Sequence, residues 1–379
     1  MTQQYQYLFT PLDTWFFREA YPYSSAGARE LHSVFPPRAV MGAIRALIAE
    51  HAGIDWDNYQ IDIAKNGLDQ EIGRENNFGK LVLEGPYLRY QRKRLAPAPL
   101  FLLQTDSLAV LKPGAPVECD LGKRVKLPVL ETRGAKSLEH TWLTTEDLRD
   151  VLIGQLPTPE KLINAKKKLY NEERHLGIAL DHQCYVTKTG MLYETRHLRL
   201  LPDVVIEAVV SGISPELHPV GKQSVRLGGE SRMAFVEVVE VKVPPPDTPA
   251  PPLVSVDDQK SDRNILIMLL TSADLGTSWL PSETFKPIET ETETVWRGEL
   301  FGIPLEIISA TIGKVLREGG WNIQGRKSRP NKSLIPAGSA WFARVLNNKT
   351  VAEAMTALSG QHIGLDSALG QGEITVGIW

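Results

Sequence analysis

Segments with the periodicity of a strand alternate with segments that have the periodicity of a helix, and this pattern restricts the fold more than any other feature. Tyr5–Phe17 is rich in aromatic residues and predicts a first strand. A helix is predicted to begin at Pro36-Pro37, because the fixed backbone angle of proline suits the first helical position. Arg38 and Arg45, two turns apart, would lie together on its flank. The apolar face of this helix would comprise Val40, Met41, Ile44, Leu47 and Ile48.

The middle of the chain is predicted to consist mainly of strands. Tyr185–Thr187 and Met191–Leu200 predict a hairpin that turns at Thr189-Gly190. Val204–Val210 has the composition of a buried strand, whereas Phe235–Val243 alternates as a half-exposed strand does.

The last third of the chain repeats the mixture of strands and helices. Asn264–Leu270 predicts a buried strand, and Ile374–Trp379 predicts a final one. Thr350 and Glu353 have the spacing that caps the start of a helix. Another helix is predicted to begin at Pro304, with an apolar face of Leu305, Ile308, Ile312 and Val315. Strands and helices in both halves predict an α+β protein with two sheet-and-helix domains.

Length and charge set broader limits. The chain has 379 residues, which exceeds the usual size of one hydrophobic core, so two domains are expected. A net charge of −3 argues against a freely acting, strongly basic nucleic-acid binder. RNA binding stays open, because a binding groove needs only local positive charge. The proline-rich segment 244–262 predicts an extended loop of the second domain or, alternatively, a linker.

Cysteine usage and the start of the sequence predict a cytoplasmic protein. Cys119 and Cys184 are the only cysteines, and two thiols in so long a chain fit a reducing cytosol. The first residues have neither the basic nor the apolar region of a secretion signal. No apolar run approaches the length that crosses a bilayer, so no membrane association is expected.

Sequence motifs that would identify a catalytic, metal or cofactor site do not occur. The eight histidines form no H-E-x-x-H pattern, and the cysteines form no C-x-x-C pair. Neither a phosphate-binding G-x-x-x-x-G-K-[ST] loop nor a G-x-S-x-G nucleophile turn is found. Nothing nominates a nucleophile or a base, so we expect no enzyme activity, no metal and no cofactor.

Three segments are locally basic. The first contains Arg89, Arg92, Lys93 and Arg94, and the second contains Lys123, Arg124, Lys126, Arg133 and Lys136. The third segment, 319–349, has no acidic residue and includes Arg326, Lys327, Arg329, Lys332, Arg344 and Lys349. Aromatic residues interleave this third segment, and cations with flat side chains are typical of single-stranded RNA binding. Ordinary solvated surfaces are the alternative interpretation.

Two glycine clusters are candidates for close contact between the backbone and a ligand. Gly370, Gln371 and Gly372 end a glycine-rich stretch, 364–372, directly before the final strand. Gly228 and Gly229 lie near Arg232 in a second cluster of the same character. Glycine leaves room at the backbone, and exposed N–H groups can hold phosphate oxygens. A simple hairpin turn would explain Gly370 and Gly372 equally well.

These segments together resemble the RAMP-type subunit of type III-B (Cmr) CRISPR effector complexes that holds the 5′ handle of the guide RNA. Matching motifs occur in order over nearly the whole chain. They are Thr10-Pro11-Leu12-Asp13, Phe16-Phe17-Arg18-Glu19, Phe35-Pro36-Pro37, Gly42-Ala43-Ile44-Arg45, 174–181, 190–193, 227–232 and 335–339, followed by the glycine-rich stretch. Two positions depart from the family pattern: Tyr21 stands in a turn that usually carries arginine, and His362 replaces a glycine.

The resemblance implies a fold and a function. The fold would be a pair of ferredoxin-like domains, residues 1–215 and 216–379, with the proline-rich and glycine-rich loops in the second. The subunit would be a non-catalytic scaffold that binds the crRNA handle and docks the large cyclase-like subunit onto the backbone RAMP subunits. Target RNA would be contacted only indirectly. The RNA-binding residues would be Arg18, Arg38, Arg45, Arg133, Gly228, Gly229, Arg232, Arg326, Lys327, Lys332, Gly370, Gln371 and Gly372.

Three other functions stay open at the level of the sequence. A RAMP endoribonuclease that processes guide precursors would need a histidine as general base, and His32 or His362 is the candidate. The chain could also be the equivalent subunit of a Csm-type (III-A) complex, which would differ in its partner proteins more than in its physical properties. An enzyme acting on small molecules is the least favoured hypothesis.

Overall fold

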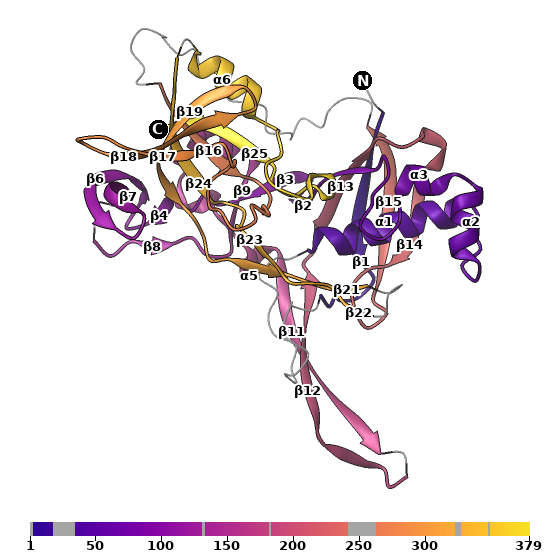
Figure 1. Cartoon of the computed structure of the whole chain (residues 1–379). Coiled ribbons are helices and arrows are strands. Elements are labelled where there is room, and N and C mark those ends of the chain that lie inside the picture. Colours follow the sequence, from indigo (N-terminus) through magenta and orange to yellow (C-terminus); the bar gives the residue numbers. More distant parts are fainter. Residues whose placement is uncertain are drawn as a thin grey trace. The chain divides into compact units, whose positions relative to one another are not determined.

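The computed structural model describes residues 3–17, 35–130, 133–181, 183–241, 263–322, 327–347 and 349–379. It consists mostly of strands, with six α-helices among these residues (Figure 1). The prediction of a mixed architecture of sheets and helices is confirmed. The chain forms two compact units, each assembled from three segments. Unit 1 comprises Met1–Arg92, Lys166–Pro245 and Leu316–Ser333, and unit 2 comprises Lys93–Ala165, Pro246–Val315 and Leu334–Trp379.

The interleaving of the two units corrects the predicted domain boundary. A single boundary at residue 215 would fall inside the middle segment of unit 1. The strand that ends at residue 211 and the strands at 221–226 and 233–241 belong to one sheet. Dividing the chain at residue 215 would therefore split this sheet. The sequence does not reveal this, because the deciding contacts join segments that are far apart along the chain.

The core of unit 1 is an antiparallel sheet covered by a helix. Its strands lie in the order β2-β13-β1-β15-β14. Their bounds are Val82–Tyr90 (β2), Val204–Ser211 (β13), Gln4–Pro11 (β1), Met233–Val241 (β15) and Gly221–Arg226 (β14). Helix α1 (Pro37–His51) packs against β2 and β14. All five residues of its predicted apolar face are buried, so this prediction is confirmed.

Several shorter elements also belong to unit 1. Two short helices, α2 (Tyr59–Lys65) and α3 (Leu68–Ile72), follow α1, and α5 (Ala165–Lys168), of which only Ala165 falls in unit 2, ends with three lysines. The segment 316–333 contributes β20 (Leu316–Glu318), β21 (Trp321–Asn322), β22 (Lys327–Ser328) and β23 (Lys332–Leu334), whose last residue falls in unit 2. β20 pairs with β23, and β21 pairs with β22.

A long hairpin extends away from the sheet of unit 1 (Figure 1). Its strands are β11 (Tyr170–Asp181) and β12 (Val186–Leu200), and Asp181 pairs with Val186. The predicted turn at Thr189-Gly190 is wrong, because β12 continues through both residues. The motif 174–181 forms the partner strand that the sequence analysis had not assigned, and this pairing places the turn between Asp181 and Val186.

Unit 2 contains a second sheet, in the order β25-β16-β24-β19-β18-β7-β6, with β17 paired to β18. Their bounds are Ile374–Ile378 (β25), Asn264–Leu269 (β16), Ala340–Val345 (β24), Ile303–Thr311 (β19), Thr294–Leu300 (β18), Gly122–Val129 (β7), Lys112–Cys119 (β6) and Lys286–Glu289 (β17). Both faces of its centre are buried. Ile265, Ile267 and Leu269 share a core with α6 (Val351–Leu358), whereas Leu266 and Met268 share one with α4 (Thr145–Leu152).

Smaller strands lie beside these cores in unit 2. β10 (Ile163–Asn164), β9 (Thr141–Thr144) and β3 (Lys93–Pro97) pair in that order, and α4 contacts β3 and β9. β5 (Leu108–Val110), β4 (Leu102–Gln104) and β8 (Lys136–Ser137) form a three-stranded sheet.

The helix predicted to begin at Pro304 is wrong, because residues 303–311 form the strand β19 between β18 and β24. Seven of its nine residues are buried, since neighbouring elements cover both faces of the strand. A continuous apolar strand can imitate the spacing of a helix, and the β-branched residues Ile307 and Ile308 favour the strand. Val315, which was assigned to the apolar face of the helix, is instead 56% exposed.

Candidate nucleic-acid interface

Helix α1 carries two arginines on one flank of unit 1. Pro37 occupies its first turn, and the chain enters the helix through Pro36 in an extended conformation. Arg38 and Arg45 are seven residues apart, so they share one side of the helix, as predicted. Arg38 Nε lies 3.7 Å from Glu318 Oε2, and the Arg38 side chain is 18% exposed. The flank of α1 therefore meets the segment 316–333 of the same unit.

Arg45 is held by the loop that follows α3. Its Nη1 donates a hydrogen bond to the backbone oxygen of Glu75 at 3.2 Å. Its guanidinium lies over the ring of Phe78, 5.9 Å from the centroid, which is within the range of a cation–π contact. Burial lowers the pKa of the Arg45 guanidinium, and the nearby charge of Arg329 lowers it further. The group stays charged at neutral pH, because arginine has too high a pKa to lose its proton.

Arg329 brings a third guanidinium to the same place. Its Nη1 donates to Asn76 Oδ1 at 2.5 Å, and its backbone N–H donates to the oxygen of Gly320. Burial lowers the pKa of Arg329, and the positive charge of Arg38 lowers it further. Glu75 and Glu318 act in the opposite direction. Arg329 thus lies near both Arg38 and Arg45, and we call the three residues the arginine cluster.

The arginine cluster can bind phosphate. A guanidinium presents a planar fork of donors that matches phosphate oxygens, and it keeps its charge when partly buried. Three such groups face two carboxylates, Glu75 and Glu318, so positive charge is in excess here although the whole chain has a net charge of −3. The flat ring of Phe78 lies against Arg45, beside the cluster. This combination is typical of an RNA contact.

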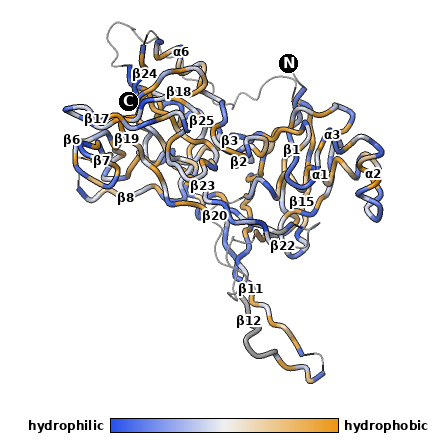
Figure 2. The backbone as a smooth tube through the Cα atoms, viewed as in Figure 1, coloured by the Kyte–Doolittle hydropathy of each residue, from blue (hydrophilic) through white to orange (hydrophobic). Residues whose placement is uncertain are grey.

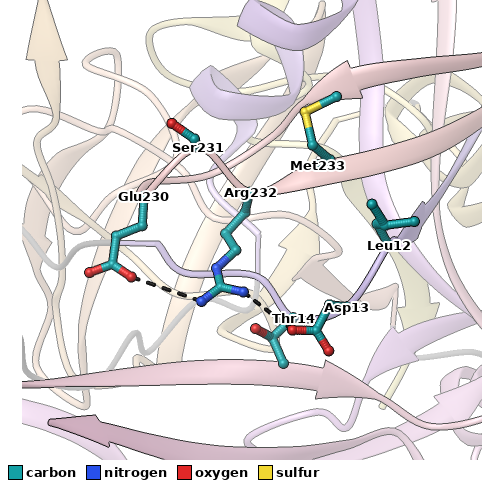
Figure 3. A pocket seen from close by; sticks show the side chains of 7 residues that line it. All are labelled: Leu12, Asp13, Thr14, Glu230, Ser231, Arg232 and Met233. Carbon is teal, nitrogen blue, oxygen red and sulfur yellow. Dashed lines mark hydrogen bonds and ion pairs between the residues drawn. The ribbon is translucent and has the colours of Figure 1, made fainter.

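The residues that follow Gly228 and Gly229 line part of a small pocket in unit 1, which Figure 3 shows from close by. The pocket has a volume of about 180 Å³ and is lined by Leu12, Asp13, Thr14, Glu230, Ser231, Arg232 and Met233. Arg232 lies between two carboxylates, with Nη1 3.3 Å from Asp13 Oδ2 and Nη2 4.0 Å from Glu230 Oε2 (Figure 3). Its charge is therefore offset by two carboxylates.

Gly228 and Gly229 pack against the chain rather than against open space. The backbone N–H of Gly229 donates to the oxygen of Phe16 at 2.7 Å. A Cβ on Gly228, where φ is +96°, would lie 2.8 Å from the same oxygen. The glycines allow the loop to approach Phe16 closely, which is a structural reason for their presence.

The end of the glycine-rich loop of unit 2 is buried. Gly370, Gln371 and Gly372 are all buried. The N–H of Gly370 donates to the oxygen of Ser367, and the N–H of Gly372 donates to the oxygen of Ser272 at 3.0 Å. Both amides predicted to hold phosphate therefore bond within the chain itself.

One protein family, described as CRISPR-associated protein (Cas_Cmr3), matches residues 7–379. The chain belongs to this family. It is thus of the Cmr3 type, which confirms the resemblance of the motifs at the level of the family. No curated protein matches the chain.

Several solved structures are similar to this Cmr3-family chain. A chain of the type III-B Cmr-beta complex bound to cognate target RNA and AMPPnP is 14% identical, with a TM-score of 0.49, over 89% of this chain and 86% of that chain. A chain of the Csm3–Csm4 subcomplex of a type III-A complex is 11% identical, with a TM-score of 0.40, over 92% and 94%. A CRISPR protein from Archaeoglobus fulgidus is 12% identical, with a TM-score of 0.27, over 100% and 99%.

The other predicted site residues of the Cmr3-family chain are divided between the two units. Lys327 and Lys332 lie in the same segment of unit 1 as Arg329, whereas Arg133 is an exposed residue of unit 2. Arg18, Arg326 and His32 fall outside the described residues. Arg329 was noted in the third basic segment but was not predicted as a contact, and its position beside α1 was not readable from the sequence.

His362, one of the two candidate general bases, contacts the glycine-rich loop. His362 Nδ1 lies 2.8 Å from the backbone oxygen of Gln371, a contact that orients the ring within the glycine-rich loop. No group of three or more histidine, cysteine, aspartate or glutamate side chains among the described residues is placed to hold a metal ion. Within the same residues, no helix is long and apolar enough to cross a membrane.

Proposed function

We propose that this Cmr3-family chain is a non-catalytic subunit that binds the 5′ repeat-derived handle of the crRNA through the arginine cluster of unit 1. In this proposal the chain also docks the large cyclase-like subunit onto the backbone RAMP subunits, and it meets target RNA only through the guide. The cluster is the observation that carries the proposal. It concentrates positive charge in a protein that is slightly acidic overall.

The proposal includes a ferredoxin-like fold for both units. Four strands of unit 1 follow the chain order β1, β2, β13, β15 and the spatial order β2-β13-β1-β15, with α1 between the first two. Four strands of unit 2 follow the chain order β16, β19, β24, β25 and the spatial order β19-β24-β16-β25, with α6 between the last two. Each set has the 2-3-1-4 arrangement of a split βαβ fold.

The residues of the arginine cluster are proposed as phosphate contacts, and Lys327 and Lys332 extend the basic surface along the same segment. RNA contact by Arg18, Arg133 and Arg326 stays a prediction. Roles for Gly228, Gly229, Gly370, Gln371 and Gly372 would require these loops to open, because the loops now pack or bond within the chain. Arg232 would have to leave its two carboxylates.

The test is to bind the full chain to an RNA oligonucleotide that carries the handle of the matching guide. The triple variant Arg38→Gln, Arg45→Gln, Arg329→Gln should bind at least tenfold more weakly. The slope of log affinity against log salt should fall by roughly 0.7 for each phosphate that the variant no longer neutralises, or about 2 in the triple variant. Fluorescence anisotropy at several salt concentrations measures both quantities.

A matched control is Arg263→Gln in unit 2. Arg263 is exposed and, like Arg45, donates to a backbone oxygen, in this case that of Asn347. This variant should bind the handle as the parent protein does. If the triple variant stays folded and keeps both the affinity and the salt slope, the arginine cluster is not the handle site.

A further inference from the structure

The base of the β11–β12 hairpin contains a buried histidine that stacks on two other rings. The side chain of His197 is fully buried. Its ring stacks on Phe16, which lies in the segment 13–17 after β1, with centroids 5.3 Å apart and an angle of 21° between the planes. It also stacks on His175 of β11, with centroids 4.1 Å apart. The hairpin and the segment 13–17 therefore meet through this histidine.

Both ring nitrogens of His197 have hydroxyl partners. Nδ1 lies 3.2 Å from Thr14 Oγ1, and Nε2 lies 3.0 Å from Thr195 Oγ1. Both threonines are buried as well. A hydroxyl group can donate or accept a hydrogen bond, so a neutral imidazole is satisfied here in either tautomer. The hydrogen bonds of the site are thus complete when the ring carries no charge.

Charged groups around His197 act in both directions. Among the described residues they are His175 and Glu173 of β11, and Glu230 and Arg232 of the loop before β15. Glu230 Oε2 lies 3.4 Å from Nε2 of the ring. Burial lowers the pKa of His197, and the positive charges of protonated His175 and of Arg232 lower it further. Glu230 and Glu173 act in the opposite direction without cancelling this effect, so the imidazole is neutral at neutral pH.

A chain of ion pairs lies beside the histidine. Arg199 pairs with Glu173 and, at 2.8 Å, with Asp13. Asp13 Oδ2 also lies 3.3 Å from Arg232 Nη1 (Figure 3). Figure 2 shows the hydrophilic base of the hairpin and the more apolar part further out. Arg199 and Asp13 are 41% and 55% exposed, so water screens their attraction. The hydrogen bond from Arg199 lowers the pKa of Glu173, so this pair persists in mild acid.

Two backbone hydrogen bonds join the same two parts of unit 1. The N–H of Trp15 donates to the oxygen of Leu198 at 2.9 Å, and the N–H of Leu198 donates to the oxygen of Trp15 at 2.8 Å. Trp15 is itself fully buried. An imidazolium at His197 would be a charge that water does not reach, which is unfavourable. Moving the hairpin base away from the segment 13–17 would hydrate the charged ring, but it would break both backbone hydrogen bonds.

We propose that His197 is a pH-sensitive switch, and that protonation of its imidazole releases the base of the β11–β12 hairpin from the segment 13–17. In water, a histidine has a pKa of about 6.5, which is higher than that of the buried ring. The released state therefore binds the proton more strongly, and release is favoured as the pH falls below about 6.5. The effect levels off below the pKa of the buried ring and vanishes above about pH 7. The proposal does not depend on handle binding, which is assigned to the arginine cluster.

Amide hydrogen exchange of the purified full chain, followed by NMR, tests the switch. The protection factors of the Trp15 and Leu198 amides should be constant above about pH 7 and should fall below about pH 6.5, by up to about tenfold for each pH unit. His197→Phe keeps a ring that cannot take up a proton, so its protection factors should not depend on pH. His197→Gln gives the same expectation with a side chain that can still bond to the threonine hydroxyls.

A matched control is the pair Ala273 and Ile335 in unit 2. These two residues form the same reciprocal backbone hydrogen bonds, at 2.9 and 2.8 Å. Their protection factors should not change over the same pH range. An equal fall at this pair would show that acid loosens the whole chain, and it would overturn the proposal.

A control variant is His175→Gln, which removes the neighbouring histidine. The fall at Trp15 and Leu198 should remain in this variant, because His197 is still buried. Its loss would assign the pH dependence to His175 and would overturn the proposal. Constant protection of Trp15 and Leu198 in the parent chain also overturns it, and so does a fall that persists in both His197 variants.

Discussion

Gly372 illustrates how one backbone position constrains the glycine-rich loop. Its φ is +76°, and a Cβ there would lie 1.9 Å from the backbone oxygen of Ile363. Its own oxygen accepts a hydrogen bond from the N–H of Ile363 at 2.9 Å, so the two strands of the turn cannot simply move apart. Glycine is required at this position by the packing of the protein itself, whether or not RNA approaches the loop.

The first prediction at this scale compares two glycines with the same backbone angle. Gly360 also has a φ of +76°, but a Cβ there would meet nothing within 4 Å. Gly360→Ala should lower the free energy of unfolding by about 1 kcal/mol, the conformational cost alone. Gly372→Ala should lower it by about 3 kcal/mol or more, because steric overlap adds to that cost. Urea unfolding followed by circular dichroism measures both.

Handle binding distinguishes a structural role of Gly372 from a role in RNA contact. The folded fraction of Gly372→Ala should bind the handle with the affinity of the parent protein. A variant of normal stability with weakened binding would contradict this interpretation and restore the loop as an RNA contact.

At the scale of elements, helix caps were recognised from local sequence. Thr350 Oγ1 accepts a hydrogen bond from the N–H of Glu353, and Glu353 Oε2 accepts one from the N–H of Thr350 at 2.8 Å. This capping box starts α6, as predicted, and the helix then packs on the sheet of unit 2 through Val351, Ala354, Met355 and Leu358. A cap involves neighbours in sequence, so it can be predicted without the tertiary structure.

The cap gives a prediction for α6. Thr350→Ala removes the side-chain acceptor and should lower the free energy of unfolding by about 1 kcal/mol. Thr350→Ser keeps a hydroxyl and should lose much less. Chemical denaturation of the two variants makes the comparison. Equal losses would mean that the methyl group of Thr350 matters and that the capping hydrogen bond does not.

At the scale of the whole molecule, the units are assembled from segments that lie far apart in the chain. β1 lies between β13 and β15, and all eight of its residues pair with β15. A fragment of residues 1–215 would lack β15 and the segment 316–333, which contributes Arg329 to the arginine cluster. Neither unit can therefore be complete in such a fragment.

We expect the fragment 1–215 to unfold without a cooperative transition when it is expressed alone. Co-expression with 216–379 should restore a cooperative transition, because the missing strands are then supplied in trans. Thermal circular dichroism and two-dimensional NMR spectra of the fragment and of the pair are the measurements. A well-dispersed spectrum from 1–215 alone would mean that the predicted boundary is correct after all.

Features that depend on neighbours along the chain could be predicted from the amino-acid sequence. The apolar face of α1, the strands β13, β15 and β16, and the cap of α6 were all predicted from local periodicity or spacing. Arg38 and Arg45 were placed on one flank for the same reason, since seven residues make two turns of a helix. The ordered motifs indicated the family, which the match over residues 7–379 confirms.

Features that depend on distant segments were settled only by the folded chain. β19 is a strand because β18 and β24 flank it, although its spacing also suited a helix. Gly372 is buried because Ser272 and Ile363 lie against it, and the oxygen of Gly370 accepts a hydrogen bond from Thr271 Oγ1. Arg329 joins Arg38 and Arg45 because the segment 316–333 belongs to unit 1. Periodicity reports which face of an element is apolar, but only long-range packing chooses the neighbour that covers that face.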